Sequence, residues 1–203
     1  EGLTLKTSIN GDFGNSSFFN YSPSTSSTTF TALPPVIATS IRRENKYLSW
    51  LNENTATYNK SFGNHNFELL GGISYQKYEG DNSQLYLSNF PDDRIRTIQS
   101  ALNIDRTASF NNINHWSLSS YFSRLNYDYD GKYLVTLALR RDGSSRFGSN
   151  NRWGNFPSVS AGWVFSDESF LENADFLSFG KIRASYGVIG NNNIGNYTQY
   201  ALV

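Results

Sequence analysis

Apolar and polar residues alternate along several stretches of the chain, as they do in a β-strand whose two faces meet different surroundings. In residues 132–141, for example, Tyr133, Val135, Leu137 and Leu139 share one face of the expected strand. The same alternation predicts seven strands, with an eighth expected before Val203. The seven cover residues 2–10, 47–59, 67–76, 116–129, 132–141, 156–166 and 178–188.

The connections between these strands alternate in length. Long segments rich in Ser, Asn and Gly are expected as loops at residues 11–45, 79–115 and 142–155, and again after residue 190. Shorter connections are expected at residues 60–66 and 167–177 and at Asp130-Gly131, a dipeptide that favours a two-residue hairpin turn. We expect a short helix in residues 93–103 and one helical turn in residues 167–177. Long and short connections in alternation predict an antiparallel up-and-down meander, as in outer-membrane β-barrels.

Charged residues fall on one face of the expected strands, and the other face is apolar. A charge that faces lipid at the bilayer midplane costs roughly 2–4 kcal/mol, so a barrel keeps that face free of charge. We therefore expect one set of residues to face lipid and the other to face the barrel lumen. The lipid-facing set is Leu137, Leu139, Trp163, Ile182 and Tyr186, and the lumen-facing set is Arg124, Arg140, Lys181 and Arg183.

Aromatic residues support the same interpretation. They make up 16% of the chain, and Tyr127, Tyr129 and Tyr133 flank the Asp130-Gly131 turn, where an interfacial aromatic girdle is expected. A soluble antiparallel β-sandwich, such as a lectin-like binding module, also alternates apolar and polar positions. In that alternative the apolar residues would pack against each other across two sheets.

Composition narrows the functional classes. Seventeen basic residues balance seventeen acidic ones, which gives no support to nucleic-acid binding. The chain has no Cys, so we expect neither disulfides nor thiolate metal sites, and it has no Met, so we expect it to be part of a longer protein. No segment has the length and hydrophobicity of a membrane helix or a signal peptide.

Several motifs resemble the SusC/RagA family of TonB-linked outer-membrane proteins of Bacteroidetes. The resemblance covers most of residues 50–197, and its most specific part is the block RRDGSSRF at residues 140–147. The matching segments are ENTATYNKSFGNH (53–65), SYFSRLNYDYDGKYLVTLALRRDGSSRFG (120–148), NRWGNFPSVSAGW (151–163), SDESF (166–170), KIRASYG (181–187) and GNNNIGNY (190–197).

The resemblance implies that the chain is one segment of a large transmembrane β-barrel of about 22 strands with a plugged lumen. It implies a plug domain and a TonB-contacting segment outside this sequence, a SusD-like surface lipoprotein as partner, and a location in the bacterial outer membrane. The family imports oligosaccharides or peptides with energy from TonB and the inner-membrane proton gradient.

Two loop clusters are candidates for contact with substrate or partner. Arg141, Arg146 and Arg152 lie in a Gly-containing loop, and local hydrogen bonds that stabilise the loop are the alternative explanation for them. Asn192, Asn193 and Tyr197 could bind sugar hydroxyls, because amides both donate and accept hydrogen bonds. A turn that uses Asn in the left-handed region is the alternative.

No feature of the sequence points to catalysis or to a cofactor. His65 and His115 stand far apart in the chain, and Asp92-Asp93 lacks the rest of an EF-hand pattern, so we expect no metal site and interpret the Asp pair as solvated loop. No nucleophile elbow, phosphate-binding loop or dinucleotide fingerprint is present. An enzyme is therefore the least favoured class.

Overall fold

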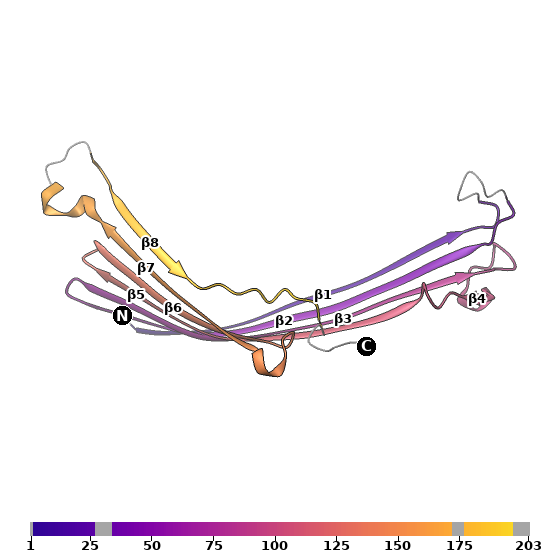
Figure 1. Cartoon of the computed structure of the whole chain (residues 1–203), viewed down its shortest axis with the longest axis horizontal. Coiled ribbons are helices and arrows are strands. Elements are labelled where there is room, and N and C mark those ends of the chain that lie inside the picture. Colours follow the sequence, from indigo (N-terminus) through magenta and orange to yellow (C-terminus); the bar gives the residue numbers. More distant parts are fainter. Residues whose placement is uncertain (1, 27–33, 172–176, 197–203) are drawn as a thin grey trace. The chain divides into compact units, whose positions relative to one another are not determined.

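The computed structural model describes residues 2–26, 34–171 and 177–196, which form an antiparallel up-and-down meander of eight strands (Figure 1). The long strands follow each other in one sheet in the order β1-β2-β3-β5-β6-β7-β8, and the short β4 pairs with β3. This confirms the predicted all-β meander. The strands are β1 (Gly2–Ser22), β2 (Thr39–Phe62), β3 (His65–Ser88), β4 (Asn103–Ile104), β5 (Phe110–Tyr129), β6 (Tyr133–Ser144), β7 (Trp153–Val164) and β8 (Lys181–Gly187).

The chain divides into two compact units. Unit 1 contains Glu1–Asn10, Trp50–Lys77 and Trp116–Val203, and unit 2 contains Gly11–Ser49 and Tyr78–His115. Strands β6, β7 and β8 lie entirely in unit 1, whereas β1, β2, β3 and β5 contribute residues to both units. The predicted lipid-facing and lumen-facing residues all belong to unit 1.

The first strands are longer than the alternation predicts. Residues 11–22 and 39–45 were expected in a loop but belong to β1 and β2, and β3 and β5 likewise extend into the expected loop at residues 79–115. Polar side chains pair across these strands, as where Asn45 Nδ2 donates to Ser16 Oγ at 3.3 Å. Because the ladder bonds are made by the backbone, a Ser- and Asn-rich composition indicates solvent exposure and does not exclude a strand.

The position of the hairpin turn at Asp130-Gly131 is confirmed, but the loop has three residues, 130–132, and not the predicted two, because Tyr129 pairs with Tyr133. Both residues have positive φ, 56° for Asp130 and 68° for Gly131, as a type I′ turn requires. Lys132 N donates to Tyr129 O at 3.0 Å, and Gly131 N donates to the Asp128 carboxylate at 3.0 Å. This turn fixes the register in which Tyr129 pairs with Tyr133 at the start of the β5–β6 ladder.

The predicted alternation of connection lengths fails at the last two connections. β6 and β7 are joined by residues 145–152, whereas β7 and β8 are joined by the longer segment 165–180. The error arose because β6 and β7 extend into the expected loop at 142–155, while β7 ends at Val164 and β8 begins only at Lys181.

Helical structure among the described residues is limited to short 3₁₀ turns. Residues 93–103 contain one such turn, Ile98–Ser100, in place of the predicted short helix. The expected helical turn near residues 167–177 begins earlier, at Phe165–Asp167 and Ser169–Leu171, and residues 172–176 lie outside the described part. A further 3₁₀ turn is Ser149–Asn151. No helix in the described ranges has the length and apolar character needed to span a membrane.

The sheet buries little of its apolar surface. Among the described residues the buried apolar side chains are Ala38, Leu87, Phe90 and Val164, and Ala38, Leu87 and Phe90 form a small cluster in unit 2. The described residues form one sheet, not the two facing sheets of the sandwich alternative. Its exposed apolar residues, including Leu137 and Ile182, therefore have no second sheet to pack against.

The Gly131 backbone supplies a first prediction. Replacing Gly131 by Ala should destabilise the folded protein by about 1–2 kcal/mol, because an L-residue is strained at this positive φ. The measurement is the free energy of unfolding of the intact protein in urea. Gly71→Ala is the matched control, since both sites have open space around the new Cβ but Gly71 has no positive φ. Equal losses in the two variants would contradict the role of the turn.

Candidate functional site

The pairing of β5, β6, β7 and β8 aligns apolar residues into rows that cross all four strands. Leu137 pairs with Leu125 on one side and with Val159 on the other, and Val159 pairs with Tyr186. Residues that pair directly in a ladder point to the same face of the sheet. The four residues therefore share one face, although they come from four separate strands (Figure 1).

We call this side of β5–β8 the apolar face. All five residues predicted to meet lipid lie on it, with exposed fractions from 38% for Trp163 to 75% for Tyr186. Whether this face meets lipid stays a prediction. The register places on it Ser119, Tyr121, Ser123, Leu125, Tyr127, Tyr129, Tyr133, Val135, Leu137, Leu139, Arg141, Gly143, Trp153, Asn155, Pro157, Val159, Ala161, Trp163, Ile182, Ala184 and Tyr186.

The opposite side of β5–β8, the polar face, carries the four residues predicted to face the lumen. Arg124, Arg140, Lys181 and Arg183 all have the register opposite to that of Leu137. A polar network links β3, β5 and β6 here: Glu68 Oε1 accepts from Arg124 Nη2 at 3.1 Å and from Asn126 Nδ2 at 2.8 Å, and Asn126 Oδ1 accepts from Thr136 Oγ1 at 2.9 Å. The Arg124–Glu68 pair is partly exposed, so it contributes little stability by itself.

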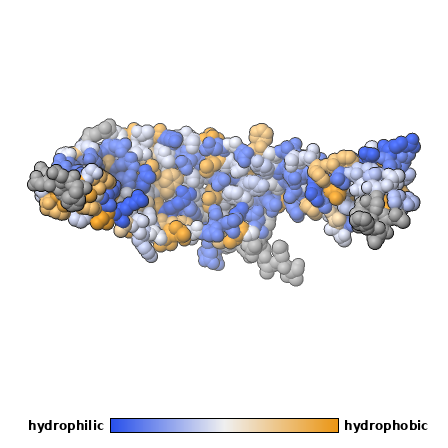
Figure 2. Space-filling model, turned by 90° about the horizontal axis from the view of Figure 1, so that it is seen from above, coloured by the Kyte–Doolittle hydropathy of each residue, from blue (hydrophilic) through white to orange (hydrophobic). Residues whose placement is uncertain are grey.

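A broad depression of about 850 Å³ lies in unit 1, and half of the residues that line it come from the polar face. Its lining brings Lys181 and Arg183 together with Asp128 and Glu68, next to amides and hydroxyls from six strands. Arg140 is not part of this lining; it donates to Asp142 at 2.8 Å and to the buried Ser120 at 2.9 Å. Hydrophilic side chains spread over much of the face seen in Figure 2, with apolar ones between them.

Aromatic rings gather where the apolar face meets the Asp130-Gly131 turn. Tyr129 lies beside Tyr133, with ring centroids 6.2 Å apart, and Tyr133 pairs with Trp163 across the ladder. The hydroxyl of Tyr133 and the indole N–H of Trp163 both donate to Glu168 Oε1, at 2.5 and 2.9 Å. These hydrogen bonds hold the pKa of the Glu168 carboxyl below its usual value.

The loop arginines predicted to contact substrate lie in different surroundings. Arg146 Nε donates to Asn196 Oδ1 at 2.8 Å, its Nη1 donates to the backbone carbonyl of Asn192 at 3.1 Å, and its guanidinium stacks on Trp116. These contacts support the alternative explanation of local loop stabilisation. Arg141 instead stacks on the Trp153 ring at 5.2 Å.

The predicted Asn cluster is only partly described. Asn192 and Arg152 line a small cavity of about 220 Å³ together with Asn191, and Asn193 N donates to Asn191 Oδ1 at 2.8 Å. That contact is a side-chain turn made by Asn191, but Asn191, Asn192 and Asn193 do not have the positive φ that the alternative to sugar binding predicted. Tyr197 lies outside the described residues.

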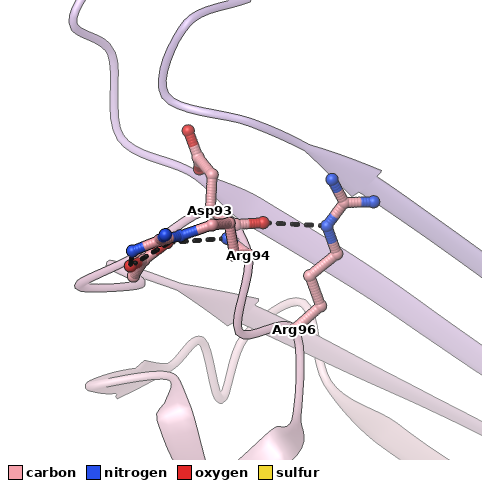
Figure 3. Close-up of polar contacts among 4 residues, drawn as sticks. Asp93, Arg94 and Arg96 are labelled. Atoms are coloured by element: carbon pink, nitrogen blue, oxygen red, sulfur yellow. Dashed lines mark hydrogen bonds and ion pairs between the residues drawn. The ribbon is translucent and has the colours of Figure 1, made fainter.

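The Asp92-Asp93 pair has a structural role that the sequence did not reveal for Asp93. The Asp93 carboxylate accepts from Ser24 N at 3.0 Å, from Ser24 Oγ at 2.7 Å and from Tyr21 OH at 2.9 Å. These bonds, the backbone one foremost, lower the pKa of Asp93. Arg96 Nε donates to the Asp93 carbonyl (Figure 3). The Arg96 guanidinium also stacks on Tyr21, so this loop is attached to the end of β1 within unit 2.

Asp92, by contrast, fits the expected solvated loop. It pairs with the exposed Arg94, which lowers its pKa to about 2 (Figure 3). In the described part of the chain, no group of three or more His, Cys, Asp or Glu side chains could hold a metal ion.

A second prediction concerns the Asp93 attachment. Asp93→Ala should make trypsin cut after Arg94 and Arg96 several-fold faster in the intact protein. The reason is that the Asp93 carboxylate accepts hydrogen bonds from Tyr21 OH, Ser24 N and Ser24 Oγ, and the variant loses all three. Asp92→Ala is the matched control and should change the rate little, since its partner Arg94 is exposed. Equal rates for the two variants would contradict the attachment.

The same attachment has a pH dependence with a defined sign. Because the folded pKa of Asp93 lies below the ordinary value of about 3.9, its contribution is present above about pH 4. It is lost as the pH falls through the folded pKa. Digestion by pepsin should therefore accelerate in that acid range more for the wild type than for Asp93→Ala.

Comparison with known proteins gives a consistent result. A family model described as TonB dependent receptor-like, beta-barrel matches residues 2–201. A TonB-dependent receptor of Formosa agariphila is 35% identical over 99% of this chain, and the receptor SusC of Bacteroides thetaiotaomicron is 37% identical over 70% of it. The chain spans only 19% and 14% of these two relatives.

Solved structures agree with the sequence matches. The chain is similar to a solved structure of the RagAB peptide transporter, with a TM-score of 0.88 and 29% sequence identity. The match covers 100% of this chain and 22% of that one. A structure of the RagAB peptide importer in the "closed-closed" state matches with a TM-score of 0.87. These comparisons confirm the predicted resemblance and the predicted barrel-fragment fold.

Proposed function

This chain belongs to the β-barrel family of TonB-dependent receptors and is a fragment of the SusC/RagA type, and from that premise we propose that it forms part of the wall of an outer-membrane importer. The observation that carries the proposal is the separation of the two faces of β5–β8. One face exposes Leu137, Val159 and Ile182, and the other carries Arg124 and Arg183.

The apolar face fits lipid better than water. Large contiguous apolar patches are rare on the surface of soluble monomers, and this one crosses four strands. The polar face carries the charged groups, as the wall of a water-filled or protein-filled lumen does. In this proposal Leu137, Leu139, Trp163, Ile182 and Tyr186 contact outer-membrane lipid, and Arg124, Arg140, Lys181 and Arg183 line the lumen.

The remainder of the receptor is proposed to lie outside this sequence. The chain covers about a fifth or less of the curated relatives it matches, so the other barrel strands, the plug domain and the TonB-contacting segment would belong to a longer protein. Import would then use energy supplied through TonB.

Oligosaccharides or peptides are the proposed cargo, with a SusD-like surface lipoprotein as partner. Support comes from the similarity to SusC and to a transporter described as carrying peptides. The depression on the polar face adds a chemical argument, because its amides, hydroxyls and charges of both signs suit polar solutes. Arg152 and Asn192, which share the small cavity, are the loop residues best placed for substrate contact.

A third prediction tests the lipid-facing assignment. Leu137→Arg and Val159→Arg in the full-length receptor should each block stable insertion, because a midplane charge facing lipid costs roughly 2–4 kcal/mol. The measurement is the amount of folded, heat-modifiable barrel in isolated outer membranes. Ser158→Arg is the matched control: it neighbours Val159 in β7 but lies on the polar face, so it should insert normally. Normal insertion of both apolar-face variants would refute the assignment.

A fourth prediction tests import itself. Cells that carry the full-length receptor should accumulate labelled oligopeptides or oligosaccharides while the proton gradient is intact, and a protonophore should abolish this uptake. A strain with the receptor gene deleted provides the background. Uptake that equals this background for both kinds of solute, or that a protonophore leaves unchanged, would exclude the proposed transport.

A further inference from the structure

Arg141 is the single charged residue on the apolar face of β5–β8, within the register that the structure describes. It pairs with Tyr121 on β5 and with Asn155 on β7, immediately after the last apolar pair, Leu139 with Pro157. The charge therefore lies at the edge of the apolar band, next to the connection 145–152. An unpaired cation deeper in that band would be strongly unfavourable.

The surroundings of Arg141 are aromatic. Its guanidinium stacks on Trp153 at 5.2 Å, and the Trp153 and Tyr121 rings lie 5.8 Å apart at 30°. The neighbouring carboxylate of Asp142 lies on the polar face and pairs with Arg140. In the described part of the chain, no ion pair with a carboxylate neutralises Arg141. Its positive charge is therefore available to an anion from outside the protein.

The position of Trp153 relative to Trp163 indicates the depth of this cluster in a bilayer. Both lie on the apolar face, about ten residues apart along β7, which is roughly 33 Å at about 3.3 Å per residue. A barrel strand tilted by about 40° converts this to roughly 25 Å, the height of the apolar band of an outer-membrane barrel. Trp153 and Trp163 thus mark its two edges, and Arg141, paired with Asn155 two residues inward of Trp153, lies close enough to that edge for its long side chain to reach the lipid headgroups.

We propose that Arg141, with Trp153 and Tyr121 beside it, binds the phosphate of an anionic lipid headgroup in the leaflet at this edge of the barrel. The proposal rests on the proposed function, because it needs the apolar face to meet lipid. A guanidinium matches phosphate through two parallel N–H donors and is weakly hydrated, so it suits an interface. Trp and Tyr favour the same depth, because one end of each ring system is apolar and the other polar.

The lipid that we propose is a phosphorylated glycolipid of the outer leaflet. The tight Asp130-Gly131 turn lies at the opposite end of β6, and short turns mark the periplasmic end of outer-membrane barrels. The Arg141 end is therefore the extracellular one. At that surface, phosphate groups on glycolipids are the anions that a membrane-facing arginine would meet.

The experiment uses the full-length receptor in a zwitterionic detergent and measures its melting temperature with and without bis-phosphorylated lipid A. Lipid A should raise the melting temperature of the wild type, and Arg141→Gln should lose at least half of that rise. Arg141→Lys should keep only part of it, because the positive charge remains but the two parallel N–H donors and the stacking on Trp153 are lost. Arg183→Gln removes a charge from the polar face and is the matched control, with the full rise expected.

Two results would overturn the proposal. One is an undiminished rise in Arg141→Gln, and the other is an equal rise from inorganic phosphate at the same concentration, which would mean that no lipid is needed. Failure here is distinct from failure of the proposed function. Blocked insertion of Leu137→Arg, together with a full rise in the melting temperature of Arg141→Gln with lipid A, would support the lipid-facing assignment and refute only the headgroup site.

Discussion

The backbone ladder that joins β5, β6, β7 and β8 determines which side chains meet which surroundings. Because strand side chains alternate with a period of two, a slip of one residue would move Leu137 to the polar face and Arg140 to the apolar one. The register is fixed at one end by the Asp130-Gly131 turn and then continues through Leu125, Leu137, Val159 and Tyr186. Both the proposed lipid-facing surface and the proposed headgroup site depend on this pairing.

In our proposal the two faces of β5–β8 meet the two different surroundings of a membrane wall. Trp153 and Trp163 lie at the two edges of the apolar face, and their spacing fits the height of the apolar band of an outer-membrane barrel. The polar face gathers hydrogen-bonding groups from several strands around the depression that Lys181 and Arg183 line. Since a single open sheet cannot bury its apolar side against itself, the surroundings must cover it, and lipid is the medium that our proposal assigns.

Local signals predicted much of this arrangement. A type I′ turn requires positive φ at both central positions, which Asp and Gly tolerate, so the turn could be located from two residues. Alternation placed the apolar residues of β6 on one face of that strand and those of β8 on one face of that strand, because a period of two is visible within a single strand. The extended parts of β1 and β2 were missed, since their Ser- and Asn-rich segments carry no apolar period and are held by pairing with distant strands. The same limitation explains the error at residues 142–155, where β6 and β7 continue beyond their apolar positions.

The amino-acid order alone therefore established the all-β class, the hairpin turn and the two sets of residues expected on opposite faces, because each follows from the geometry of a single strand or turn. The partners of individual side chains were decided only in the folded chain. Asp93 reaches Ser24 and Tyr21, Arg146 reaches Asn196, and Arg141 remains at an aromatic edge while Arg140 turns to Asp142. These contacts, most of them between residues far apart in sequence, depend on the register and course of several strands together, which no local pattern encodes.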